Sequence, residues 1–284
     1  MKDSISSKQT GLFSTARKFY PQAPLFSHFV DKPLGKALLA LFLLSVFVGD
    51  ALAGPDQKQG ILATLWKWMP LMFQGFLLNI LVSVLSMTIG TAAGAFLGLA
   101  QVSQFSPIRK SARLLMQFFR NAPWLVLVFF TIAIIPFEFR IASHVIPFPG
   151  WLKATIGLSF PVMANTAEIF RGGIQSIPLT QWESAGSLAF SRTQTLWMII
   201  IPQCVKRMLP PWMNLYAILT TATPLISLVG VNDALTLTRS ALMAEGRIEL
   251  LLPMYSILLI WFFLYCYPIS VWTVRLERRF SVKI

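Results

Sequence analysis

Residues 73–102 read FQGFLLNILVSVLSMTIGTAAGAFLGLAQV and contain no Asp, Glu, Lys or Arg. Charge-free runs of this kind occupy residues 68–108, 208–232 and 250–274. Each exceeds the roughly 20 apolar residues with which an α-helix crosses a bilayer core about 30 Å thick. Only 12% of the 284 residues are charged, and soluble domains have about twice that share. The sequence therefore predicts an all-α integral membrane protein.

The apolar segments predict six membrane spans. They are residues 37–53, 73–102, 114–137, 152–174, 211–231 and 251–274, and the third has an irregular start at 120–123. With both termini in the cytoplasm, 17 of the 24 lysines and arginines lie on the cytoplasmic side and six on the outer side. This bias fixes the orientation by the positive-inside rule. It also accounts for most of the net charge of +13, so no nucleic-acid partner is expected.

The first predicted span stands apart from the others. We expect residues 1–35 to form a cytoplasmic tail, 36–54 an additional transmembrane helix and 55–72 a periplasmic connection. Ala51-Leu52-Ala53 resembles a signal-peptidase site, but about 36 residues precede the apolar run, more than an ordinary signal peptide has. An uncleaved anchor is therefore the preferred interpretation.

The connection between the fourth and fifth spans contains two helix-start signatures. Thr180-Gln181-Trp182-Glu183 and Ser191-Arg192-Thr193-Gln194 both fit the capping box, in which two side chains bond each other's backbone amides. Between them, residues 184–189 predict a short helix of mostly small side chains, and the apolar run 196–201 ends at Pro202, which does not continue a helix comfortably. Such a helix fits a groove of another protein. The pattern fits equally well an interfacial helix pair that only turns the chain.

The same connection resembles a known motif. Glu183-Ser184-Ala185, followed by Ala189 and by Ile199-Ile200-Ile201-Pro202-Gln203, resembles the EAA loop of bacterial ABC importer permeases. Further similarity to the polar amino acid (histidine, glutamine, arginine) class of these permeases lies in Glu168–Pro178, Arg207, Leu209–Pro211, Asn214, Leu225, Ser227 and Gly230-Val231. Phe119-Arg120-Asn121-Ala122-Pro123 is similar to the Phe-Arg-Gly-Thr-Pro element of that class. The resemblance covers residues 73–280 and implies a five-helix type I permease core, preceded here by the extra N-terminal helix.

The resemblance implies a function and partners. The chain would be the permease subunit of an ATP-driven importer for a polar amino acid or similar compound, in a bacterial inner (cytoplasmic) membrane. A separate ATPase dimer would bind ATP-Mg, a periplasmic solute-binding protein would deliver solute, and a second copy or a related permease would complete the pair. The chain has no GxxxxGK[ST] element, so neither enzymatic activity nor a cofactor is expected in it. The residues expected to couple it to the ATPase, within loop 176–210, are Glu183, Ser184, Ala185, Gly186, Ala189, Ser191, Arg192 and Pro202.

Two departures from the family pattern affect these expectations. The usual Gly of the loop is Ala189 and the first alanine position is Ser184. Both residues are small, so docking on the ATPase is expected to survive. The Lys-x-Thr-Ser-Leu element of the class appears as Thr221-Ala222-Thr223-Pro224-Leu225. Loss of the Lys and gain of Pro224 leave the type of solute open.

Glu168 is the most conspicuous polar residue inside a predicted span, where an isolated carboxylate costs several kcal/mol. Either it contacts a cationic group of the solute, or Arg171, three residues further along the helix, neutralises it. Neutralisation is preferred. The other candidates for the solute pathway are Arg120, Asn121, Asn165, Thr221, Thr223 and Ser227. Ser and Thr in membrane spans more often bond backbone carbonyls, which weakens each hydroxyl as a candidate.

Competing functions have less support in the sequence. A secondary transporter or channel without an ATPase would need coupling-ion carboxylates near the membrane midplane, and only Glu168 qualifies. A membrane enzyme or metal site would need a cluster of His, Cys or carboxylates, and none is visible. Cys204 and Cys266 lie far apart near apolar segments and are interpreted as reduced packing residues.

Overall fold

The computed structural model describes residues 37, 40, 42–47, 60–141 and 144–280. The chain divides into two compact units, residues 1–44 and 45–284. Residues 42–47 are helical, and most of the predicted tail and additional span lies outside the described residues. The architecture given below is that of the second unit.

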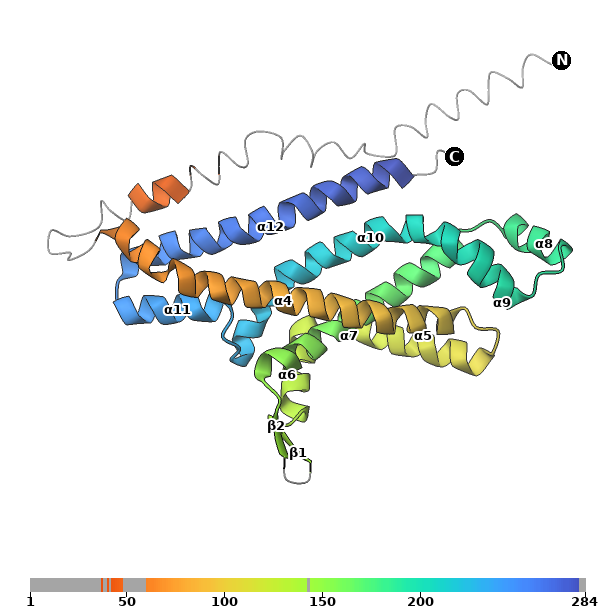
Figure 1. Ribbon diagram of the computed structural model, residues 1–284, viewed down its shortest axis with the longest axis horizontal. Coiled ribbons are helices and arrows are strands. Elements are labelled where there is room, and N and C mark those ends of the chain that lie inside the picture. The colour runs from red at the N-terminus through yellow and green to blue at the C-terminus, as the bar shows by residue number, and fades with distance from the viewer. Residues whose placement is uncertain (1–36, 38–39, 41, 48–59, 142–143, 281–284) are drawn as a thin grey trace, which may run out of the picture. The chain divides into compact units, whose positions relative to one another are not determined.

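Helices make up almost all of this unit (Figure 1). The α-helices are α4 (Ile61–Gln101), α5 (Ser106–Asn121), α6 (Trp124–Ile134), α7 (Gly150–Gln175), α8 (Leu179–Ser187), α9 (Arg192–Gln194), α10 (Ile201–Ala222), α11 (Ala234–Glu245) and α12 (Leu251–Phe280). The π-helix η1 covers Thr195–Ile200, and the 3-10 helices are η2 (Thr223–Val229) and η3 (Ile248–Leu250). Strands β1 (Glu138–Ile141) and β2 (His144–Pro147) form an antiparallel hairpin.

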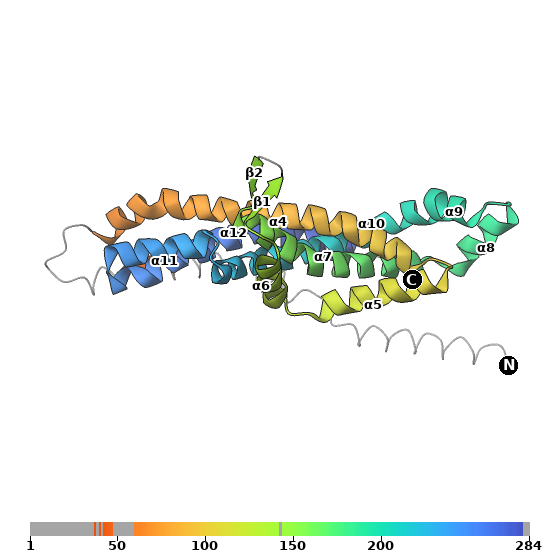
Figure 2. The same ribbon diagram turned by 90° about the horizontal axis from the view of Figure 1, so that it is seen from below.

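Close approach of α4 and α7 forms the centre of the unit, and α7 also packs on α5, α6 and α10 (Figure 2). Three α4 glycines, four residues apart, face α7. A Cβ atom added at Gly90 would lie 2.5 Å from Val162, at Gly94 2.6 Å from the Met163 carbonyl, and at Gly98 2.6 Å from Phe170. Small residues at this spacing let two membrane helices pack backbone to backbone.

Three described helical stretches are long and apolar enough to cross a membrane, namely Ile61–Gln101, Arg192–Val229 and Ile248–Phe280. A fourth is obtained if the bent pair α5–α6 is one broken span. The 26-residue α7 matches the predicted fourth span in position but is not among them. It contains Lys153, Glu168 and Arg171 and packs on four other helices, so protein rather than lipid surrounds much of it.

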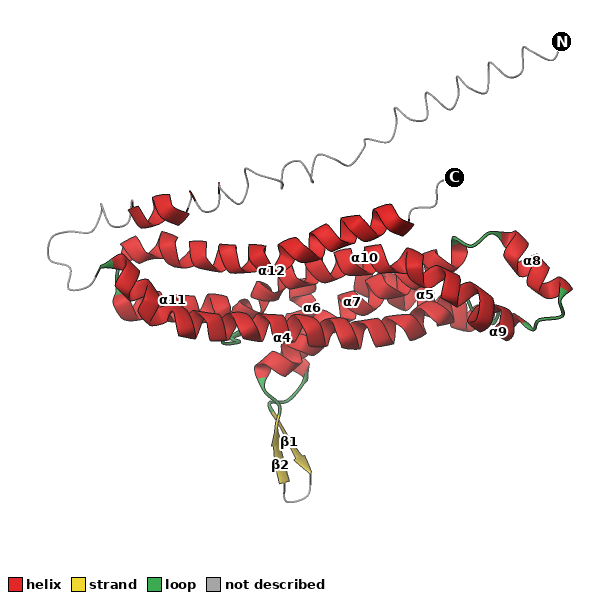
Figure 3. Ribbon diagram, turned by 45° about the horizontal axis from the view of Figure 1, so that its top comes forward, coloured by secondary structure: helices red, strands yellow, loops and turns green. Residues whose placement is uncertain are grey.

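The irregular start predicted for the third span is a full break between two helices. α5 and α6 meet at 103°, with the break at Ala122-Pro123 inside the predicted irregular start. Pro123 favours an extended conformation at Ala122, whose ψ is 136°, and this ends α5. Beyond α6 comes the hairpin of β1 and β2, between the predicted third and fourth spans, where no strand was predicted (Figure 3).

Other predicted boundaries also move. α4 begins at Ile61, so residues 61–72 are helical rather than a connection. α10 begins at Ile201 instead of 211, and the prediction that a helix ends at Pro202 is wrong. The backbone stays helical from η1 through Ile200 and Ile201, so Pro202 lies within a continuous helical stretch, directly after an irregular π-helical turn. Next to Pro224, which does not fit the interior of an α-helix, α10 gives way to the 3-10 helix η2 at Thr223.

The side chain of Lys153 in α7 packs against the C-terminal end of α6. Its ammonium group is fully buried, donates to the Ile135 carbonyl at 2.6 Å and lies 3.1 Å from the centre of the Phe137 ring. Ile135 is the C-cap of α6, where backbone carbonyls lack partners and a positive charge is favourable.

Candidate functional site

Helix α8 presents a small and polar surface to solvent. Glu183, Ser184, Gly186 and Ser187 are exposed, and Ala185 is the buried residue of this helix, with 2% of its surface accessible. A Cβ atom added at Gly186 would meet nothing within 4 Å. Of the residues predicted to contact an ATPase, Ala185 therefore faces its own chain, whereas its neighbours face outward.

One of the two predicted capping boxes forms. Ser191 caps α9: its hydroxyl accepts from Gln194 N at 3.3 Å, and the Gln194 side chain accepts from Ser191 N at 2.8 Å. The box expected at Thr180 and Glu183 is wrong, because α8 begins two residues earlier than expected, with Pro178 as N-cap. Thr180 is then already inside the helix, and its hydroxyl cannot cap the first turn.

Ala189 connects α8 to α9 in a left-handed conformation, with φ of 58°. Most L-residues avoid this region because Cβ crowds the following carbonyl. The resemblance places a glycine at this position in related permeases, and the backbone of this chain keeps the conformation that glycine adopts freely.

An apolar cluster fixes this loop to the helix bundle. Ile174, Ile177, Ile200, Cys204 and Met208 form its buried centre, and Trp182, Leu196 and Ile199 pack against it. Gly173 permits the close contact with α10, since an added Cβ would lie 2.5 Å from Met208 Cε. Both cysteines are free and Cys204 is buried, as predicted for packing residues. The expected short helix seated on apolar residues of the following segment is thus present.

Glu168 and two arginines form the charged group near the end of α7. Arg171 Nε donates to Glu168 Oε2 at 2.9 Å, and Arg171 Nη2 also contacts the carboxylate. Arg120, from the last turn of α5, lies 3.7 Å from Glu168 Oε1. The structure therefore brings together two pathway candidates from different helices, and confirms that Arg171 balances the Glu168 charge.

The remaining pathway candidates bond mainly within their own helices. Asn165 Nδ2 donates to the Pro161 carbonyl at 2.8 Å, and the hydroxyls of Thr221 and Thr223 donate to Ile218 and Thr220 carbonyls at 2.8 Å. Ser227 Oγ is buried without a partner, and Asn121 is exposed at the end of α5. Within residues 60–141 and 144–280, no hydrogen bond or ion pair joins the Glu168 group to Thr221, Thr223 or Ser227.

Two buried residues that the sequence had not singled out join α4 to α11. Asn79 Nδ2 donates to Asp233 Oδ2 at 3.2 Å, and Ala234 N donates to Asn79 Oδ1 at 3.0 Å. Asp233 also caps α11 by accepting from Thr236 N at 2.9 Å. The signal was the isolated amide of Asn79 in an otherwise apolar run, since polar groups inside spans usually have partners.

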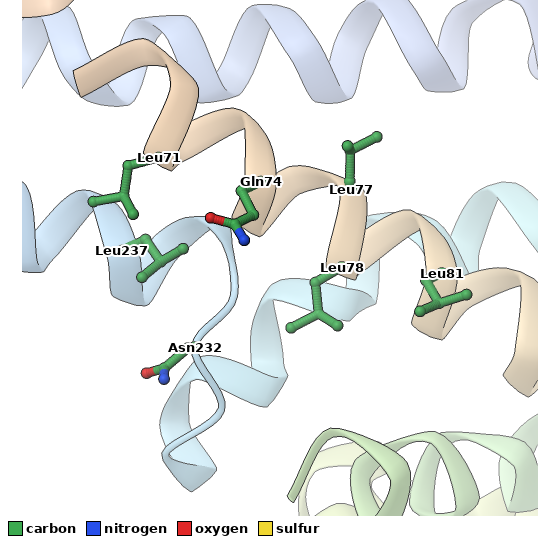
Figure 4. A pocket seen from close by; sticks show the side chains of 7 residues that line it. All are labelled: Leu71, Gln74, Leu77, Leu78, Leu81, Asn232 and Leu237. Carbon is green, nitrogen blue, oxygen red and sulfur yellow. The ribbon is translucent and has the colours of Figure 1, made fainter. Parts of the chain in front are cut away.

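A shallow cavity of about 430 Å³ lies beside this junction. Figure 4 shows that α4 supplies Leu71, Gln74, Leu77, Leu78 and Leu81, and that Asn232 and Leu237 lie across from them. None of the predicted site residues lines it.

An apolar bundle, an exposed short helix on the loop between α7 and α10, and a broken third span together define an integral membrane transport component. Residues 90–282 match the family described as binding-protein-dependent transport system inner membrane component. The chain belongs to this family, and it is a multi-pass permease subunit rather than an enzyme.

Relatives and solved structures agree with this assignment. The chain is 32% identical over 212 residues to the probable amino-acid ABC transporter permease protein YckA of Bacillus subtilis (strain 168), covering 75% of this chain and 90% of that protein. It is 28% identical to the probable glutamine ABC transporter permease protein GlnP of the same strain, covering 78% and 96%. The crystal structure of an amino acid ABC transporter with histidines has the same fold, with a TM-score of 0.63 at 23% identity, over 78% of this chain and all of that one.

Proposed function

We propose that this permease subunit imports a polar amino acid or an amino-acid-like compound, and that loop 176–210 couples it to a separate ATPase dimer. The observation that supports coupling is α8, which exposes Glu183, Ser184 and Gly186 and rests on the apolar cluster beneath it. The outer face of α8 has small side chains, and its inner face packs on the apolar cluster. A short helix held in this way can transmit movement of a partner to α7 and α10 without bending.

The proposal includes the partners and the location. Family membership implies a solute-binding protein and an ATPase, and ATP-Mg belongs to the ATPase. We place the chain in a bacterial inner (cytoplasmic) membrane with both termini in the cytoplasm, and we expect a second copy or a related permease to complete the pair. The distribution of lysine and arginine supports this orientation.

Relatives whose names include amino acids and glutamine support the solute class. Transport without an ATPase has no support from Glu168, because two arginines already balance its charge. The direct test is uptake into vesicles that contain the permease, its ATPase and its binding protein, with each polar amino acid offered in turn. We expect ATP-dependent uptake of one of them. Uptake that persists without ATP, or uptake of no amino acid, would overturn the proposal.

Coupling through α8 is tested by Gly186→Trp. Gly186 is exposed and a Cβ atom added there meets nothing within 4 Å, so the fold should persist while the bulky ring blocks docking on the ATPase. We expect co-purification with the ATPase and transport to fall at least about tenfold, the loss that a misfit of a little over 1 kcal/mol produces. Gly172→Trp is the matched control, since Gly172 is also exposed with nothing within 4 Å but lies in α7. Equal behaviour of the two variants would exclude α8 as the docking surface.

A further inference from the structure

A cavity at the α8 end of the bundle is lined by arginines and contains an unbonded buried amide. It has a volume of about 590 Å³, within the range of ligand pockets. Arg109, Arg113 and Arg192 line it, and none of the described residues lining it is Asp or Glu. These residues come from α5 and α9, and the ends of α4, α7 and α8 complete the walls (Figure 2). We call it the arginine cavity.

Gln101 at the end of α4 is the residue that indicates a ligand. It lines the arginine cavity and is fully buried, yet neither its Nε2 nor its Oε1 has a hydrogen-bond partner. Leaving a buried polar atom without a hydrogen bond is unfavourable, so such groups normally have a partner. A ligand satisfies both atoms of this amide when it has an acceptor for Gln101 Nε2 and a donor for Gln101 Oε1.

Arg109 and Arg192 are held in place and still have donor groups available. Arg109 Nη1 donates to the Ser103 and Gln104 carbonyls at 2.9 and 3.3 Å, which leaves Nε and Nη2 without a partner in the described chain. Arg192 lies 5.4 Å from the Trp182 ring, and its Nε and Nη1 lie 3.2 Å from the Gln104 amide. The Glu168 carboxylate is bound to Arg171 and does not line the cavity.

The remainder of the lining is apolar and comes from Val102, Ile174, Ile177 and Leu196. Guanidinium groups bind phosphate oxygens bidentately, and a hydroxyl on the same ligand would donate to Gln101 Oε1. We propose that the arginine cavity binds a phosphate group whose ligand also has a hydroxyl. In phosphatidylglycerol the hydroxyl belongs to the glycerol headgroup, and in inorganic phosphate it belongs to the phosphate itself. Basic cavities between helices on the cytoplasmic side are suited to anionic lipid headgroups. A bound phosphate would join the start of α5 to α9 and so brace the loop that contains α8.

The proposal is independent of the solute and is tested on the purified full chain. In detergent, wild type is mixed with equal amounts of phosphatidylglycerol and phosphatidylcholine, and retained lipid is measured by native mass spectrometry. We expect preferential retention of phosphatidylglycerol, and a decrease of about tenfold or more in Arg113→Gln and Arg192→Gln, since each removes a charged hydrogen bond. Lys110→Gln is the matched control, because it removes the same charge from α5 outside the cavity.

A second arm separates the two sources of phosphate. Thermal unfolding of the delipidated chain is measured in sodium phosphate and in sodium chloride of equal ionic strength. Stabilisation by phosphate, lost in Arg113→Gln, assigns the site to the phosphate group alone. Retention of phosphatidylglycerol without stabilisation by inorganic phosphate assigns it to the lipid.

Gln101→Leu keeps the proposal testable if an arginine variant fails to fold. It should raise the unfolding temperature of the ligand-free chain, because the unbonded amide is gone, and weaken phosphatidylglycerol retention several-fold. Equal retention of the two lipids by wild type together with no effect of phosphate would overturn the proposal. An equal loss in Lys110→Gln and Arg113→Gln would also overturn it, since general surface attraction would then explain binding.

Discussion

Ala189 holds a left-handed backbone in the turn between α8 and α9. A Cβ in this region costs about 1–2 kcal/mol. Glycine removes this strain, but its greater freedom in the unfolded chain offsets part of the gain in stability. We therefore expect Ala189→Gly to stabilise the protein by up to about 1 kcal/mol, measured by unfolding in detergent. Ala185→Gly, in the helix itself, should destabilise it by a similar amount. Destabilisation by both changes would contradict the strain assigned to Ala189.

Asn79 is the second residue whose environment makes a sharp prediction. Asn79→Leu keeps the side-chain size but leaves Asp233 and the Ala234 amide without their partner in a buried place. We expect a loss of about 2–4 kcal/mol in unfolding free energy. Asn165→Leu should cost less than about 1 kcal/mol, because that amide is partly exposed and bonds only to its own helix. Similar costs for the two variants would show that the junction of α4 and α11 does not depend on Asn79.

At the scale of the elements, the contact of α4 with α7 is set by glycine. Gly94→Ala would bring a methyl group to 2.6 Å from the Met163 carbonyl, a backbone atom that cannot turn away. We expect a loss of about 1–3 kcal/mol from this overpacking. Gly186→Ala in α8 is the control: its methyl group meets nothing, so it should stabilise the helix by up to about 1 kcal/mol. Unfolding of both variants under the same conditions measures the difference, and a harmless Gly94→Ala would mean that the helices separate readily.

Elements with strong local signals were predictable from sequence, and elements set by distant contacts were not. The apolar run of α4, the break at Pro123, the Ser191 capping box and the change of helix type at Pro224 all follow from neighbouring residues. The hairpin of β1 and β2 had no such signal, because each strand has only four residues and neither is bounded by a strong turn motif. α4 also begins before its predicted span, and α12 ends after its predicted span.

At the scale of the whole molecule, Glu245 connects α11 to α4 and makes stability depend on pH. Its carboxylate accepts from Lys67 Nζ and Trp68 Nε1, both at 2.7 Å. The hydrogen bond from Lys67, followed by that from Trp68, lowers the pKa of Glu245 below its ordinary value of 4.5, against the opposing effect of burial. A carboxyl whose pKa is lower in the folded state contributes stability above the ordinary pKa, and this contribution disappears as the pH falls below it.

We therefore expect the unfolding temperature of wild type to decrease more than that of Glu245→Gln between about pH 5 and pH 3. The difference should be modest, because the Lys67 side chain is 55% exposed and solvent screens the pair. Glu138→Gln, in the exposed hairpin, is the control and should follow wild type. Parallel curves for wild type and Glu245→Gln would show that this contact does not affect stability.

In the candidate site, too, features set by neighbouring residues were predictable from sequence, and features set by contacts between distant segments were not. The sequence located the α8 loop, because its residue types follow one another along the chain. It paired Glu168 with Arg171 for the same reason, and missed the approach of Arg120 from another helix. It also missed the arginine cavity, which five separate segments enclose, because spacing along one helix gives no sign of such a meeting.

The 103° bend between α5 and α6 has one further consequence. Eleven residues of helix extend about 16 Å, half the thickness of a bilayer core, so α6 cannot take its open carbonyls to the headgroup layer by length alone. Lys153 brings an ammonium group to that end instead. At the end of α6, a side chain of the neighbouring helix α7 thus supplies the hydrogen bond that water would otherwise supply.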